Sequence, residues 1–132
     1  MNSEVVRNPS NEAHYMQLDD MTQTVRVTLD GTVIAQTPNA MRLLEVGRSL
    51  YPPQYYIPEA EISVPLGKTG KSTHCPLKGN AAYFDVLDGD GKVRAAELGW
   101  AYPEPYDFAS RLAGYIAFDP RRVSITIEAQ EQ

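Results

Sequence analysis

The residue types best suited to chemistry are concentrated in residues 73–83 (THCPLKGNAAY), near the middle of the chain. This stretch holds the only cysteine, Cys75, one of the two histidines, His74, and Lys78, which lies between a proline and a glycine that constrain the backbone. A thiolate stabilised by an ammonium group is a nucleophile or a redox centre. A lone cysteine is more often a small buried apolar side chain. We interpret Cys75 first as a pocket wall, keep the nucleophile as the alternative, and expect the turn to aim Lys78 into a site.

The same residues do not form an obvious dyad or metal site. Adjacent side chains of an extended chain point to opposite faces, so His74 is poorly placed to deprotonate Cys75. With His14, these residues supply too few ligands for a structural zinc site. Residues 88–91 (DGDG) are interpreted as a hairpin turn, because a calcium loop would place Val86 at its first ligand position. We expect no metal site, and the sequence identifies no catalytic residue and no cofactor.

The elements that position these residues are predicted to be mainly β-strands. Apolar and polar residues alternate at 24–29 and resume at 33–35 around Asp30-Gly31, a pair that favours a tight hairpin turn. A second hairpin is predicted for residues 81–87 and 92–102, joined by the DGDG turn. Both hairpins connect strands that follow one another in the chain, which indicates a mostly antiparallel sheet.

The other segments are short. We expect strands at 55–57, 115–118 and 123–127, a helix at 106–112 and a loop at 67–72, while residues 38–50 fit either a helix or a strand. The total is about seven or eight short strands with one or two short helices, which favours a compact, mostly antiparallel barrel or sandwich. We place this single globular β domain at residues 24–129 and interpret residues 1–23 as an N-terminal arm that can add an edge strand.

Aromatic and charged side chains from separate predicted strands are candidates for one pocket. A barrel or sandwich brings several of these aromatics together, as a pocket lining or as core filling. Lys78 and Arg42 would bind an anionic group. Alternatively, Arg42 and Glu45 could form a surface pair. The candidate ligand-binding residues are Arg42, Glu45, Tyr56, Thr73, Cys75, Lys78, Trp100 and Tyr102.

Length, composition and charge restrict the class of protein. A chain of 132 residues with 42% apolar and 22% charged residues fits one folded domain. The net charge of -5 argues against a nucleic-acid partner. The sequence has no apolar run of about 18 residues that would span a membrane. The single cysteine and the polar N-terminus, which does not resemble a signal peptide, lead us to expect a cytoplasmic protein.

A series of short motifs resembles the domain of unknown function 427 family. In chain order the motifs are residues 31–35 (GTVIA), Arg42 with Glu45, residues 55–58 (YYIP), Thr73 with residues 75–79 (CPLKG), residues 100–105 (WAYPEP) and residues 114–118 (GYIAF). The resemblance covers about residues 25–128 and implies a small, mainly β protein of bacteria or fungi. The family carries a nucleotidyltransferase-like label, which implies phosphate and metal chemistry. Leu77 departs from the family, in which this position is commonly aromatic.

Three functions remain open from the sequence. The first is a small-molecule binding or enzymatic domain whose pocket is framed by residues 73–83 and takes a small anionic or aromatic ligand. The second is a non-enzymatic interaction module that pairs its aromatic residues or strand edges with a partner, in the simplest case as a homodimer. The third is a nucleotidyltransferase-like enzyme. The sequence does not decide whether the protein is an enzyme.

Overall fold

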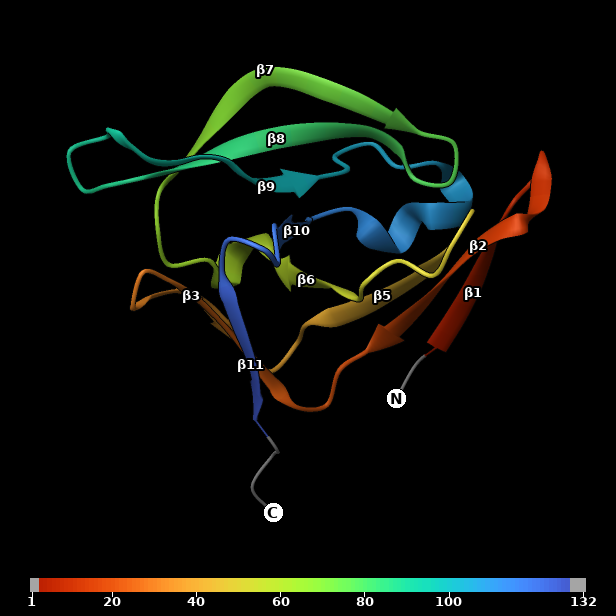
Figure 1. Cartoon of the computed structure of the whole chain (residues 1–132), viewed down its shortest axis with the longest axis horizontal. Coiled ribbons are helices and arrows are strands. Elements are labelled where there is room, and N and C mark those ends of the chain that lie inside the picture. The colour runs from red at the N-terminus through yellow and green to blue at the C-terminus, as the bar shows by residue number, and fades with distance from the viewer. Residues whose placement is uncertain (1–2, 129–132) are drawn as a thin grey trace.

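The computed structural model describes residues 3–128, which form two antiparallel sheets (Figure 1). The large sheet has the strand order β1-β2-β5-β6-β10-β9-β8-β7, and the small sheet has the order β11-β3-β4. The strands are β1 (Ser3–Asn8), β2 (Asn11–Asp20), β3 (Thr24–Leu29), β4 (Thr32–Thr37), β5 (Met41–Val46), β6 (Gln54–Pro58), β7 (Leu66–Cys75), β8 (Gly79–Leu87), β9 (Val93–Ala101), β10 (Tyr115–Phe118) and β11 (Ser124–Glu128). Two short 3-10 helices are η1 (Glu59–Glu61) and η2 (Asp107–Leu112). The mainly β prediction is confirmed, as a sandwich-like arrangement rather than a closed barrel.

Both predicted hairpins are present. Asp30 and Gly31, with φ angles of 48° and 81°, join β3 to β4. Positive φ at both central positions matches the twist of paired strands and explains why an Asp-Gly pair stands here. The DGDG turn joins β8 to β9, where the backbone N–H of Asp88 donates to the carbonyl of Lys92 at 2.8 Å. These strands were predictable because the turn chemistry is local.

The structure corrects the prediction for one segment and decides between helix and strand for another. The predicted loop at residues 67–72 is wrong, because these residues lie in β7, where Gly67, Lys68 and Ser72 pair with β8. β7 is an edge strand with an irregular register between Lys68 and Ser72, so its glycines and lysines reflect solvent exposure rather than a loop. The ambiguous residues 38–50 contain a strand, β5, which is held by β2 on one side and β6 on the other.

Residues 3–20 belong to the large sheet, in the region that the sequence suggested to be an arm with an edge strand. β1 lies at the edge of the sheet and pairs with β2, and β2 pairs in turn with β5. Val6, Met16 and Leu18 are buried, which fixes this hairpin to the core. The N-terminal hairpin can therefore supply side chains to a site on the sheet.

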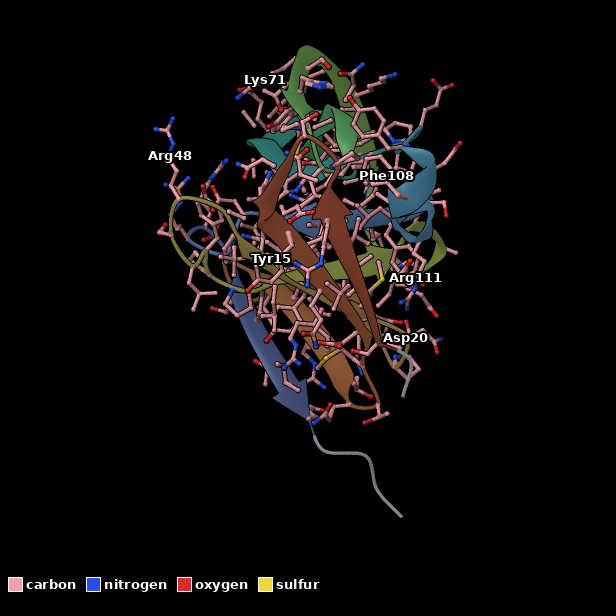
Figure 2. The ribbon with its side chains drawn as sticks, turned by 90° about the vertical axis from the view of Figure 1, so that its right-hand side faces the viewer. Tyr15, Asp20, Arg48, Lys71, Phe108 and Arg111 are labelled. Carbon is pink, nitrogen blue, oxygen red and sulfur yellow. The ribbon has the colours of Figure 1, made fainter. Side chains whose placement is uncertain are left out.

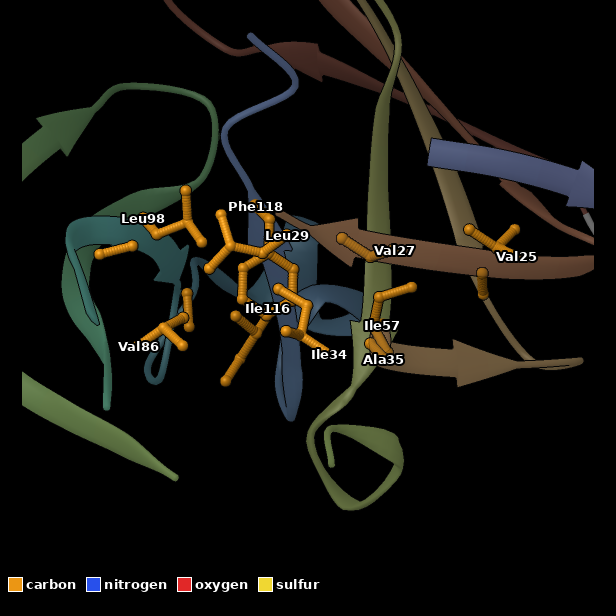
Figure 3. Close-up of a cluster of buried hydrophobic side chains, with 13 residues drawn as sticks. Val25, Val27, Leu29, Ile34, Ala35, Ile57, Val86, Leu98, Ile116 and Phe118 are labelled. Carbon is orange, nitrogen blue, oxygen red and sulfur yellow. The ribbon is translucent and has the colours of Figure 1, made fainter. Parts of the chain in front are cut away.

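The centre of the large sheet is covered on one face by the small sheet (Figure 3). Ile57, Ile116 and Phe118 of the large sheet lie in one buried cluster with Val27 and Ile34 of the small sheet. Alternate residues of these central strands point to the opposite face. The central strands are therefore apolar on one side and free to carry functional side chains on the other.

The opposite face is concave, because the large sheet curls until β7, β8 and β9 lie above β5 and β6 (Figure 1). Leu43 of β5, Leu77 of the β7–β8 turn and Leu112 of η2 fill part of this curl in a second buried cluster. The guanidinium of Arg111 on η2 donates to the carboxylate of Asp20 on β2 (Figure 2). The remaining part of the concave face holds the candidate site. Within residues 3–128 no helix is long and apolar enough to span a membrane.

Candidate functional site

Strand register carries aromatic side chains across the concave face. Ala117 of β10 pairs with Tyr56 of β6 on one side and with Trp100 of β9 on the other. Trp100 pairs in turn with Tyr83 of β8. Directly paired residues of an antiparallel sheet share a face. Small Ala117 therefore separates the rings of Tyr56 and Trp100, and three strands present their aromatics to one space.

That space is a groove of about 750 Å³ that follows β9. Five of the predicted ligand-binding residues line it: Glu45, Tyr56, Lys78, Trp100 and Tyr102. Further lining residues come from segments that the sequence did not connect with the site, among them Tyr51, Lys71, Tyr83, Glu97, Asp119, Arg121 and Arg122. The structure therefore brings together most of the predicted set and enlarges it.

The other three predicted residues, Arg42, Thr73 and Cys75, do not line the groove, and Arg42 lies on another face. Its Nη2 donates to Oδ2 of Asp19 at 2.9 Å, on the face of β5 opposite to the groove. Residues three apart in a strand point to opposite faces, so Arg42 and Glu45 cannot both reach the groove. Neither do they pair with each other, which corrects the alternative of an Arg42–Glu45 surface pair.

At the inner end of the groove, Lys78 and Glu45 form a buried ion pair. Lys78 Nζ donates to Glu45 Oε1, and the exposed fractions of the two side chains are 8% and 15%. Burial acts to raise the pKa of Glu45, but the charge of Lys78 and hydrogen bonds from Lys78 and His14 outweigh it, so this pKa lies below its ordinary value. Glu45 is therefore a carboxylate, and it neutralises the charge of Lys78.

His14 and Asn8 extend this pair into a directed chain of hydrogen bonds. Asn8 Oδ1 accepts the backbone N–H of Ser10 at 2.9 Å, which orients the amide so that Asn8 Nδ2 donates to His14 Nδ1 at 3.2 Å. The proton of the imidazole is thereby assigned to Nε2, which donates to Oε2 of Glu45 at 2.8 Å. His14 and Lys78 both donate hydrogen bonds to Glu45, so the carboxylate of Glu45 faces the ammonium of Lys78 at this end of the groove.

Cys75 lies beside this network. Its Sγ is 3.8 Å from Lys78 Nζ, and the residue is half-buried. His74 points away, with Nδ1 2.8 Å from Asn80 Oδ1 and Nε2 3.1 Å from the hydroxyl of Tyr106. This separation matches the prediction that the adjacent His74 and Cys75 do not form a dyad.

Tyr56 and Tyr102 form buried walls of the groove. Trp100 Nε1 donates to the hydroxyl of Tyr56 at 3.3 Å. Burial and the neighbouring Tyr102 raise the pKa of Tyr56 well above its ordinary value, and burial together with Cys75 raises the pKa of Tyr102. Thr73 does not line the groove itself, but its Oγ1 is 2.9 Å from the hydroxyl of Tyr83, which does.

The outer end of the groove is formed by the turn between β10 and β11. Arg122 Nη1 donates to the carbonyl of Ala96 at 2.7 Å, near the beginning of β9. Arg121 Nε lies 3.2 Å from Oδ1 of Asp119, and hydrogen bonds from Arg121 lower the pKa of this carboxylate against the effect of burial. Charged groups therefore line this end at the protein surface.

Comparison with known proteins identifies the family. A family described as "Domain of unknown function (DUF427)" matches residues 17–129. The chain belongs to this family. The match confirms the resemblance given by the short motifs. The matched segment begins in the second half of β2. No curated protein matches the sequence at a significant level.

The N-terminal hairpin contributes two residues to the network around Glu45 that were not among the predicted site residues, Asn8 and His14. Asn8 and His14 precede the matched segment, so the family match covers Glu45 and Lys78 of the network but not the other two residues. The available signal was the alternation of Met16 and Leu18 with polar residues, which is typical of a half-buried strand. Within residues 3–128, no group of three or more histidine, cysteine or acidic residues could hold a metal ion.

Proposed function

We propose that this DUF427 domain binds a small organic molecule with a planar, aromatic part in the groove along β9. The observation that supports the proposal most strongly is the cross-strand row of Tyr56, Trp100 and Tyr83, with Trp100 and Tyr83 only half-buried. An aromatic face that stays partly exposed inside a concave site is suited to stacking on a planar ligand. The groove volume of about 750 Å³ lies within the range of roughly 300–1,000 Å³ typical of small-molecule sites.

The groove favours binding over nucleotidyl transfer. Such a reaction needs carboxylates that are free to hold divalent cations beside the phosphates. Glu45 pairs with Lys78 and His14, Glu97 lies 3.4 Å from Lys71, and Asp119 pairs with Arg121. Because each acidic side chain of the groove already has a basic partner, we do not propose nucleotidyl transfer for this domain.

Two rings of the groove, those of Tyr56 and Tyr102, are poorly suited to a protein interface. Tyr56 and Tyr102 have exposed fractions of 1% and 8%, so a partner's surface could contact little of either ring. Hot-spot aromatics of an interface must be reachable from the partner before they are buried. A dimer that uses these rings is therefore not part of the proposal, and sedimentation at low concentration tests this point, since a stable dimer would oppose it.

The binding proposal is tested with N-phenyl-1-naphthylamine, a neutral two-ring fluorescent probe with an added phenyl group. Trp100 is the only tryptophan of the chain, so loss of its emission reports directly on the groove. We expect saturable quenching of Trp100 together with sensitised emission of the probe. Tyr83→Ala should weaken binding about tenfold, because one aromatic stacking partner contributes roughly 1–3 kcal/mol.

Tyr15→Ala is the matched control for Tyr83→Ala. Tyr15 lies on β2, where its ring packs under Arg7 and does not line the groove (Figure 2). This variant should bind the probe as the unmodified chain does. Binding that leaves Trp100 emission unchanged, or that Tyr15→Ala weakens as much as Tyr83→Ala, would overturn the proposal.

A further inference from the structure

The groove is positively charged within an acidic protein. Its lining contains four basic residues, Lys71, Lys78, Arg121 and Arg122, and three acidic residues, Glu45, Glu97 and Asp119. The whole chain carries a net charge of -5. A local excess of one sign in a concave site raises the local concentration of ligands of the opposite sign. One basic residue of the lining must therefore lack an acidic partner in the groove.

Lys78 does not supply the excess, although its position in the groove suggests an anion-binding role. Its ammonium is paired with the carboxylate of Glu45 inside the protein. An anion bound directly to Lys78 would have to compete with this pair and would leave Glu45 as a buried charge without a cation, which is costly. Lys71 and Arg121 are each matched by one carboxylate in a pair at the protein surface, with Glu97 at 3.4 Å and Asp119 at 3.2 Å.

Arg122 is the basic residue of the groove that pairs with no carboxylate within 4.0 Å among residues 3–128. Its side-chain hydrogen bond goes to a neutral group, the carbonyl of Ala96, at 2.7 Å. This bond fixes the guanidinium at the outer end of the groove without neutralising it. The remaining N–H groups of a guanidinium form a planar fork that fits the oxygens of a carboxylate, sulfonate or phosphate.

The positions of Arg122 and Trp100 define the ligand. Ala96, which holds Arg122, lies four residues before Trp100 on β9, and the bulge at Glu97 makes this segment shorter than a regular strand. An aromatic molecule can therefore place its rings beside Trp100 and its acidic group beside Arg122. At the inner end Glu45 neutralises Lys78, so that end has no excess charge with which to compete for the acidic group.

We infer that the groove selects planar organic anions and that Arg122, rather than Lys78, binds their acidic group. This inference rests on the proposed function, because it assumes that the rings occupy the groove. It extends that function in two ways. It names the ligand class, an aromatic carboxylate, sulfonate or phosphate ester, and it names the residue that distinguishes this class from neutral aromatics.

The test compares two probes that share one ring system. 8-Anilino-1-naphthalenesulfonate is N-phenyl-1-naphthylamine with a sulfonate added. We expect the sulfonate probe to bind more tightly to the full chain. Arg122→Gln should weaken the sulfonate probe about tenfold, as expected for a charge-assisted hydrogen bond, and leave the neutral probe unchanged. Arg7→Gln removes the same charge outside the groove and should change neither affinity.

The outcomes separate the two proposals. If both probes bind equally, or Arg122→Gln changes neither, the inference fails while the proposed function stands; if neither probe quenches Trp100, the proposed function fails. Arg122→Gln also removes the bond to Ala96, so its melting temperature is compared with that of the unmodified chain. Arg122→Lys keeps the charge and must bind the sulfonate more tightly than Arg122→Gln. Equal affinities of these two variants would overturn the role of charge.

Discussion

Lys78 and Glu45 lie 33 residues apart in the sequence and form an ion pair at the inner end of the groove. Lys78 comes from the β7–β8 turn and Glu45 from β5, so the pair joins opposite sides of the curled sheet. Tyr102 covers Lys78, with Nζ 5.8 Å from the ring centroid. The pair therefore closes one end of the groove, and its charges hold each other in place.

Removing one partner of this pair should be more costly than removing both. Lys78→Met leaves Glu45 as a buried carboxylate without its cation and should lower the free energy of unfolding by about 3–5 kcal/mol. In the double variant Lys78→Met with Glu45→Gln no charge remains, so the loss should be smaller than the sum of the single losses. Urea unfolding of the four proteins measures this coupling. Additive losses, within about 0.5 kcal/mol, would contradict an interacting pair.

The lowered pKa of Glu45 predicts a loss of stability in acid. The pKa is lower in the folded chain than its ordinary value of 4.5, so the pair contributes its full stability above pH 4.5. That contribution is lost as the pH falls through the folded pKa. The free energy of unfolding, measured from pH 7 to pH 3, should therefore depend less on pH below 4.5 in Glu45→Gln than in the unmodified chain.

Asp119→Asn is a useful control in the same titration. Hydrogen bonds from Arg121 also lower the pKa of Asp119, but the Arg121 side chain is 87% exposed, so solvent weakens the pair. The acid slope of Asp119→Asn should remain close to that of the unmodified chain. An identical slope in Glu45→Gln and the unmodified chain would show that Glu45 does not carry the acid sensitivity.

Asn8 is predicted to set the tautomer of His14. Two-bond proton–nitrogen correlations of the imidazole should show the proton on Nε2 at neutral pH, because Asn8 donates to Nδ1. Asn8→Asp replaces that donor with an acceptor and should move a proton onto Nδ1. Observation of an Nδ1 proton in the unmodified chain would contradict the assigned direction of the hydrogen-bond chain.

Gly47 is predicted to leave the space in which the ring of Tyr51 packs as part of the groove lining. A Cβ at residue 47 would lie 3.1 Å from Cε2 and 3.2 Å from the hydroxyl oxygen of Tyr51. Gly47→Ala should therefore shift this ring, change its proton resonances and alter probe binding, at a stability cost of about 1 kcal/mol. Gly70→Ala, where a Cβ meets nothing within 4 Å, is the control. Unchanged Tyr51 resonances in Gly47→Ala would contradict this role.

The fold was predictable where its determinants are local. The Asp30-Gly31 turn and the alternation in β3 encode their hairpin within a dozen residues. β7 was not predictable in this way, because the polar residues 67–72 belong to a strand that is held by pairing with β8 on either side of residues 69–71. An edge strand exposed to solvent lacks the apolar alternation on which such predictions depend.

The site was predictable in its aromatic and central polar residues but not in its ends. Glu45, Lys78 and Trp100 were marked by residue type and by position in the motifs. His14 was missed because its segment was interpreted as an arm, and only the register of β2 with β5 shows that it reaches Glu45. Arg122 was missed because a polar turn carries no sign of the groove that it borders.

The most direct test of the binding account is the indole N–H resonance of Trp100, which is unique in this chain. Trp100 lies between the two ends of the groove and donates to Tyr56 at 3.3 Å, so a ligand on its ring must change this resonance. Titration with N-phenyl-1-naphthylamine should shift the signal saturably, with the same dissociation constant as the fluorescence change. A resonance that stays in place while the probe binds and other signals move would contradict the assignment of the groove as the binding site.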